Sequence, residues 1–173
     1  MVQRKEWFSR KFPFDLQTWM FPNIVERLRG TPARLEGRVA SLSGEMLTRR
    51  DEDRWSIQEN VGHLLDLEPL WAGRLDDFDA GLETLRPADL TNKKTHEASH
   101  NAASIDELLG AFRSSRLEMM RRLDGLSEKH VERVALHPRL KTEMRVLDLA
   151  FFVAEHDDHH LAQITELIRK FEK

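Results

Sequence analysis

Two histidines four residues apart stand near the C-terminal end of the chain, in the run HDDHH at 156–160. On a helix, this spacing places the imidazoles of His156 and His160 one turn apart on one face, where both can bind the same ion. The neighbouring residues on that face are apolar, so the pair is expected to point into a protein interior. The alternative is a pair of core histidines hydrogen-bonded to other helices, because each unpaired buried polar group costs on the order of 1–3 kcal/mol.

A third histidine, His63, interrupts an apolar stripe that also contains Asn60 and Leu67. One buried histidine is usually a hydrogen-bonded core residue, but three directed at one interior are harder to explain without an ion. We therefore predict that His63, His156 and His160 bind one divalent metal ion. Three imidazole nitrogens leave a coordination position open for water or substrate, which is typical of a catalytic site. Zinc and nickel suit this ligand set best, with iron or manganese as alternatives.

Carboxylates close to these histidines are candidates for a catalytic role. Glu59 and Asp66 lie about one helical turn on either side of His63, and Asp157 adjoins His156. Each could accept a hydrogen bond from a metal ligand or relay a proton. A solvated carboxylate is the alternative for each of the three.

The segment HEASH at 96–100 matches the HExxH motif of zinc metalloproteases. That chemistry needs both histidines on one helix in an apolar setting, with the glutamate as general base. The flanking residues 92–95 and 101–103 are mostly polar, so we predict a solvated loop and not a protease site. His100 stays a candidate catalytic residue, because it precedes a predicted helix and could approach the metal. His159 is expected to face outward or toward a neighbouring helix.

The elements that must position these residues are helices, because apolar residues recur at three- and four-residue spacing and no alternating strand pattern persists. The predicted helical segments are 19–28 and 32–42 (one kinked helix or two), 57–81, 105–125 and 145–173. Ser56 with Glu59, and Ser104 with Glu107, have capping-box spacing at two of the helix starts. Pro69 predicts a kink or a break within its helix.

The connections complete the predicted architecture. Residues 47–54 are charged and aperiodic, 82–103 form a long polar crossover between the second and third helices, and 126–143 combine a turn with a loop. This pattern indicates an all-α fold, a four-helix bundle. We expect a single domain over 1–173, with its core at about 18–171.

Composition excludes several classes of protein. The 173 residues include 27 Lys and Arg against 30 Asp and Glu, so no basic balance favours nucleic-acid binding. Cysteine is absent, which removes disulfides and thiolate ligands. No window approaches the roughly 20 apolar residues that cross a membrane, and the N-terminal residues do not read as a signal peptide. We therefore expect a soluble, cytoplasmic protein that binds neither nucleic acid nor membrane.

Two sequence blocks carry a family resemblance. WSIQENVGHL at 55–64 and AEHDDHHLAQI at 154–164 resemble the DinB/YfiT-like superfamily, which has one histidine on its second helix and an HxxxH pair on its last. The resemblance in helix order covers about 18–171. It implies an up-down-down-up four-helix bundle, often a homodimer, with a divalent metal bound by His63, His156 and His160. The family name refers to DNA-damage induction and does not imply DNA binding.

The resemblance also suggests reactions. Family members include metal-dependent transferases that act on low-molecular-weight thiols, a thiol-dependent isomerase and proteins assigned as metal-dependent hydrolases. Since this chain has no cysteine, any thiolate must arrive with a cosubstrate. The leading hypothesis is an enzyme whose metal activates a small thiol, or water, for attack on a small-molecule substrate. The alternatives are a metal-dependent hydrolase and a non-catalytic, metal-binding stress-response protein.

Overall fold

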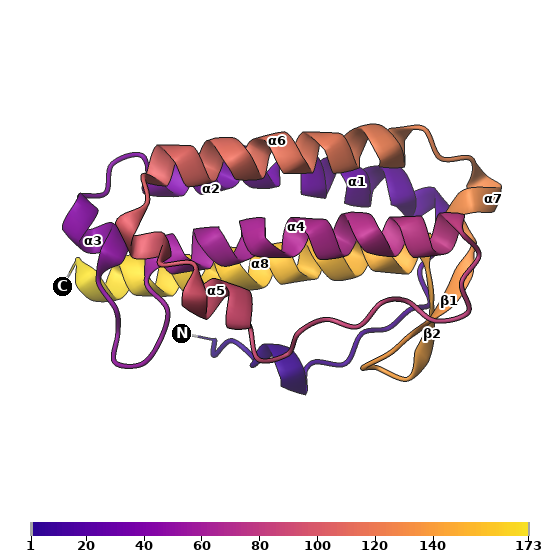
Figure 1. The fold of residues 1–173 in the computed structure, drawn as a ribbon, viewed down its shortest axis with the longest axis horizontal. Coiled ribbons are helices and arrows are strands. Elements are labelled where there is room, and N and C mark those ends of the chain that lie inside the picture. The colour runs from indigo at the N-terminus through magenta and orange to yellow at the C-terminus, as the bar shows by residue number, and fades with distance from the viewer. Residues whose placement is uncertain (1, 173) are drawn as a thin grey trace.

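Four helical columns pack lengthwise in the computed structural model, which describes residues 2–172 (Figure 1). The columns are α4 (Ile57–Asp79), α6 (Ile105–Asp124), α8 (Val146–Phe171), and the pair α1 (Phe21–Arg29) and α2 (Thr31–Val39), which follow one another end to end. Gly30 separates α1 from α2, so the first column consists of two helices. The predicted four-helix bundle is confirmed. No helix within residues 2–172 is both long enough and apolar enough to span a membrane.

Helix α4 carries part of the site and begins as the sequence predicts. The Ser56 hydroxyl accepts from the backbone N–H of Glu59 at 3.1 Å, and the Glu59 carboxylate accepts from the Ser56 N–H at 2.8 Å. The helix then continues through Pro69 to Asp79, so of the predicted kink or break, the break does not occur. Buried residues on both sides of the proline pack against neighbouring helices and offset the lost hydrogen bond. The second predicted capping box is also wrong, because the Ser104 side chain makes no cap hydrogen bond.

The connections contain more regular structure than predicted. Short helices are α3 (Gly44–Thr48), α5 (Lys93–Glu97) and α7 (Glu128–Val131), with 3₁₀ turns at Trp7–Ser9, Thr18–Met20 and His100–Ala102. Strands β1 (Val134–His137) and β2 (Thr142–Arg145) form an antiparallel hairpin that pairs Ala135 with Met144. Ala135 and His137 are buried while Val134 is exposed, but four residues are too few for a recognisable alternation.

A buried ion network joins the columns at mid-bundle. Arg116 of α6 donates to the Glu68 carboxylate of α4 at 2.7 Å and also bonds the Asp157 carboxylate of α8. The Thr31 hydroxyl of α2 donates to Asp157 at 2.8 Å. Although burial opposes its charge, the carboxylates of Asp157 and Glu68 raise the pKa of the Arg116 guanidinium. The network holds together elements that are distant in the sequence.

Two segments outside the bundle cover one side of α4 and α8. The N-terminal segment and the crossover after α4 run along the bundle on the same side as the hairpin (Figure 1). The crossover is tied to the hairpin because the Leu85 N–H donates to the Leu136 carbonyl at 3.0 Å. Arg10 of the N-terminal segment pairs with Glu155 of α8 at 3.4 Å. These segments enclose the cavity that contains the candidate site.

Candidate metal centre

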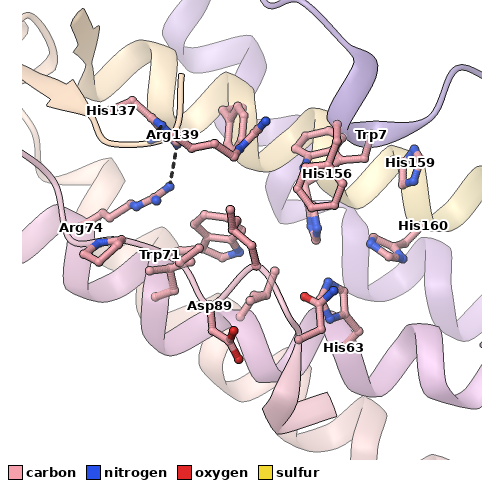
Figure 2. Close-up of a pocket in the computed structure, with 18 of the residues that line it drawn as sticks. Trp7, His63, Trp71, Arg74, Asp89, His137, Arg139, His156, His159 and His160 are labelled. Atoms are coloured by element: carbon pink, nitrogen blue, oxygen red, sulfur yellow. Dashed lines mark hydrogen bonds between the residues drawn. The ribbon is translucent and has the colours of Figure 1, made fainter. Parts of the chain in front are cut away.

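Three imidazoles meet at the inner surface of the cavity, one from α4 and two from α8 (Figure 2). One ring nitrogen from each of His63, His156 and His160 lies within 4.8 Å of the others, a spacing that permits all three to bind one ion. The ring centroids are 4.6 Å apart for His156 and His160, and 4.8 Å apart for His63 and His160. All three side chains are buried. The structure therefore brings together the three residues that the sequence predicts as metal ligands.

A hydrogen-bond relay orients His63. The Thr95 hydroxyl donates to the Asp66 carboxylate at 2.9 Å, so its oxygen can accept from the N–H at Nδ1 of His63, 3.0 Å away. We assign the proton of His63 to Nδ1, which leaves the lone pair on Nε2 available to a metal. Asp66 also accepts from Nε2 of His100 at 2.8 Å. Gly62 leaves room for this, because a Cβ there would lie 2.3 Å from the His100 ring.

The other two imidazoles differ in how their Nδ1 atoms are satisfied. Nδ1 of His160 donates to the amide oxygen of Asn60 at 2.8 Å, which leaves Nε2 of His160 free to bind an ion. Nδ1 of His156 is buried and has no hydrogen-bond partner among residues 2–172. A buried polar atom without a partner is destabilising unless water or an ion satisfies it. An ion is one partner that such a nitrogen can take.

The imidazoles are held in the neutral form that binds metals. Burial lowers the pKa of His63 to about 4. Burial and the neighbouring imidazoles lower the pKa values of His156 and His160 well below the usual 6.5. At neutral pH all three rings are neutral, each with one nitrogen lone pair, so a metal does not have to displace a proton to bind them.

Tryptophan side chains form much of the wall around the histidines. The Trp55 ring lies 4.6 Å from that of His63, and the Trp7 and Trp71 rings lie 5.0 Å and 5.7 Å from that of His156. The cavity has a volume of about 440 Å³, within the usual range for small-molecule sites. It can hold a small molecule next to the three imidazoles.

The remaining candidates divide into two groups. Asp66 and His100 lie beside the site through the relay to His63. Glu59 and Asp157 are engaged elsewhere: Glu59 caps α4 and accepts from Nε of Arg50 at 2.9 Å, while Asp157 belongs to the buried ion network. Neither carboxylate is among the residues that line the cavity.

The two remaining histidine expectations have different outcomes. The prediction that His159 faces outward or toward a neighbouring helix is wrong, because His159 is 5% exposed, lines the cavity and bonds Arg4 of the N-terminal segment at 2.9 Å. The segment 96–100 does not form a protease helix: α5 ends at Glu97, and Ser99 adopts a left-handed conformation with φ 51°. The crossover there is not purely solvated, since Thr95 and His100 are buried.

Sequence reasoning missed several residues of the cavity. Trp7 precedes the expected core, and no periodicity connects it to α8. Thr95 lies in a polar stretch and carries no recognisable motif. Arg74 and His137 are buried at the far end of the same cavity. The signal that the sequence offered for Arg74 was its place among apolar residues at helical spacing, where a further apolar residue is expected.

Thr95→Val tests the relay to His63. The substitution conserves shape and removes the hydroxyl, so His63 loses the acceptor that fixes its tautomer. We expect metal affinity to fall roughly 10- to 100-fold, as for other outer partners of metal-bound histidines. Competition titration against a chelating dye measures the change. Thr142→Val, at an exposed position of β2, is the matched control; equal affinities for the two variants would contradict a role for Thr95.

The metal-free protein is expected to lose stability as the pH falls below 6.5. The unfolded chain takes up protons on its histidines there, whereas burial lowers the folded pKa of His63 and His137 to about 4 and that of His159 to about 3. The contribution of these histidines to the free energy of unfolding is therefore complete above pH 6.5 and decreases toward pH 4. Each such histidine contributes up to roughly 1.4 kcal/mol per pH unit. Urea unfolding between pH 7.5 and 5 measures the slope, and a flat profile would contradict these shifts.

A sequence model of the DinB superfamily matches residues 27–164, and the chain belongs to this superfamily. The uncharacterized protein YuaE of Bacillus subtilis (strain 168) is 28% identical over 156 residues, which cover 82% of this chain and 96% of YuaE. The superfamily resemblance of the sequence is thus confirmed.

Solved structures with the same fold include two with described activities. YfiT from Bacillus subtilis, described as "a probable metal-dependent hydrolase with an unusual four-helix bundle topology", superimposes with a TM-score of 0.77 at 23% identity and 94% coverage of both chains. The mycothiol-dependent maleylpyruvate isomerase gives a TM-score of 0.65 at 12% identity, covering 88% of this chain and 62% of the isomerase. At these identities the likeness establishes the fold.

Proposed function

We propose that this protein is an enzyme that binds one divalent metal ion through His63, His156 and His160 and activates a small thiol cosubstrate for attack on a small electrophile. The observation that carries the proposal is the meeting of three buried imidazoles at the wall of a cavity of about 440 Å³. A purely structural metal is normally closed off by four protein ligands. Here three ligands face a space that can admit substrate.

The residues present fit such an ion. Neutral imidazoles suit zinc and nickel, and the unpartnered Nδ1 of His156 marks a place where the folded chain lacks a polar partner. When bound, a divalent ion lowers the pKa of a thiol or of water and so supplies a nucleophile at neutral pH. The thiol must come from solution, because the chain contains no cysteine.

The chain's own side chains prepare the site for this chemistry. The side-chain oxygens of Asn60 and Thr95 accept hydrogen bonds from the Nδ1–H groups of His160 and His63, and so fix the orientation of both rings. Asp66 holds the Thr95 hydroxyl in the orientation that accepts from His63. The Trp55 and Trp7 rings exclude water from the imidazoles, which strengthens electrostatic interactions inside the cavity.

A metal-dependent hydrolase is the second candidate. The description of YfiT as a probable metal-dependent hydrolase favours it, while the similar fold of a mycothiol-dependent isomerase favours the thiol-dependent reaction. The two differ in the nucleophile, a thiol in one case and water in the other. The same three histidines serve both.

Activity assays of the zinc- and nickel-loaded protein separate the candidates. Small electrophiles such as chlorodinitrobenzene are offered with several low-molecular-weight thiols, and simple esters and amides are offered without thiol. Thiol-dependent turnover that is lost on chelation and in His160→Ala supports the proposal. Thiol-independent hydrolysis with the same losses would replace it with the hydrolase. Inactivity of the metal-loaded protein across all substrates would overturn both in favour of a non-catalytic metal-binding protein.

A further inference from the structure

The cavity extends beyond the histidine cluster to a second polar end. Arg74, His137 and Arg139 lie there, on α4 and on the hairpin (Figure 2). Trp71 and Phe152 lie between the two ends: the Phe152 ring is 5.3 Å from that of His137, and the Trp71 ring is 5.7 Å from that of His156. The cavity therefore has a metal-binding candidate at one end, an apolar middle and a cationic end.

His137 has hydrogen-bond donors at both ring nitrogens. Its Nδ1 accepts from the backbone N–H groups of Arg139 and Leu140, each at 3.2 Å. Its Nε2 lies 3.2 Å from Nη1 of Arg74, which can only donate. A neutral imidazole carries one proton, and with Nδ1 occupied as an acceptor that proton belongs on Nε2. The N–H at Nε2 then faces Arg74 and lacks an acceptor.

Neither arginine forms an ion pair with a carboxylate in the part of the chain that the structure describes. Arg74 is 1% exposed, and its Nε donates to the Arg86 carbonyl at 3.2 Å. Nη2 of Arg139 is buried without a hydrogen-bond partner. Among residues 2–172, no carboxylate oxygen lies within ion-pair distance of either guanidinium. Burial lowers the pKa of Arg74 to about 10, although the Asp77 carboxylate acts in the opposite direction. The Arg74 and Arg139 guanidinium groups lie 5.5 Å and 5.3 Å from the Trp71 and Phe8 rings, and these cation–π contacts do not replace hydrogen-bonded anions. An anion bound at this end of the cavity would therefore stabilise the buried charge.

The carboxylates in the neighbourhood are already committed or exposed. Asp77 binds the Arg86 side chain at 2.7 Å. Asp89 lines the cavity, but its oxygens accept from Thr91 and from the Lys93 N–H, 2.9 Å away. Glu6 also lines the cavity and is exposed to solvent. None of them supplies the missing acceptor.

We propose that Arg74, Arg139 and the Nε2–H of His137 bind the carboxylate of a small organic acid, whose apolar body packs against the cavity wall formed by Trp71 and Phe152, two rings that contact each other edge to face. A guanidinium fork matches the two oxygens of a carboxylate, and His137 supplies a further donor. The apolar middle excludes a fully hydrated polar ligand. This part of the inference rests on the proposed function: the other end of the acid carries the group that reacts beside the three histidines.

Binding of three matched probes to metal-free protein tests the inference, and removing metal eliminates a competing site for anions. Phenylacetate, phenylacetamide and phenyl phosphate share one apolar ring and differ in the head group. We expect phenylacetate to bind roughly tenfold or more tightly than phenylacetamide, because it gains hydrogen bonds to charged donors. Equal affinity for acid and amide would overturn the proposal. Tighter binding of phenyl phosphate than of phenylacetate would overturn the choice of a carboxylate.

Arg139→Gln tests whether the preference for phenylacetate over phenylacetamide arises at this end of the cavity. Arg139 is only half-buried, so the variant is expected to fold, which thermal unfolding checks. We expect this variant to lose most of the preference for the acid. Arg121→Gln, which removes the same charge at an exposed position of α6, is expected to retain it. An undiminished preference in Arg139→Gln would contradict the assignment.

Metal titration of the same proteins separates this inference from the proposed function. Arg139→Gln is expected to bind metal as the parent protein does. If the parent binds phenylacetate but no metal, the proposed function fails and the carboxylate site stands. If metal binds but the acid and amide are equivalent, the metal site stands and the carboxylate site fails.

Discussion

His160→Ala is expected to abolish stoichiometric metal binding. The substitution removes one of three imidazole ligands and leaves Asn60 without its partner at 2.8 Å. Two ligands on a buried wall cannot hold a divalent ion tightly. We therefore expect metal affinity to fall by more than the roughly 100-fold that removal of a hydrogen-bond partner of a metal-bound histidine can cause. Isothermal titration with zinc and nickel, with a competing chelator, measures the loss.

His130→Ala is the matched control for this substitution. His130 lies on α7, outside the cavity, and its Nδ1 contacts the Ser127 hydroxyl at 2.6 Å. We expect parental metal affinity in this variant. A similar loss in both variants would indicate a general effect of removing a histidine, and unchanged affinity in His160→Ala would exclude His160 as a ligand.

Arg116→Met is expected to destabilise the protein by about 3–5 kcal/mol, because it leaves the Glu68 and Asp157 carboxylates buried without their cation. Arg116 is 1% exposed and reaches both carboxylates, on α4 and α8. The side chains that it leaves unpaired belong to two different columns of the bundle. Urea unfolding followed by circular dichroism measures the free energy of unfolding.

A triple variant separates the lost charge from lost packing. Arg116→Met with Glu68→Met and Asp157→Leu removes the whole ion network and is expected to recover most of the stability. Arg121→Met, at an exposed position of α6, should change stability by no more than about 0.5 kcal/mol. If Arg116→Met is as stable as Arg121→Met, the network does not contribute to the fold as described.

The helical columns and the histidine cluster were predictable because each depends on local periodicity. His156 and His160 are four residues apart on one helix, and the capping box at Ser56 fixes where the helix of His63 begins. These patterns indicate which face of each helix is buried. The bundle then brings the buried faces together without further information from the loops.

The surroundings of the cluster were not predictable, because long-range contacts decide them. Thr95 reaches His63 only because the crossover folds back on α4, and Trp7 reaches α8 from the N-terminal segment. Asp157 illustrates the opposite case. It adjoins a predicted ligand in sequence, but the helix turns its side chain toward Arg116 and away from the cavity.

Metal analysis of the untagged protein, purified without a metal-affinity column, tests the central claim most directly. The three buried imidazoles predict about one divalent ion per chain, by mass spectrometry of the metal content or after titration with zinc or nickel. A chain that contains no metal and takes up none at neutral pH would contradict the claim, and the histidines would then be buried core residues.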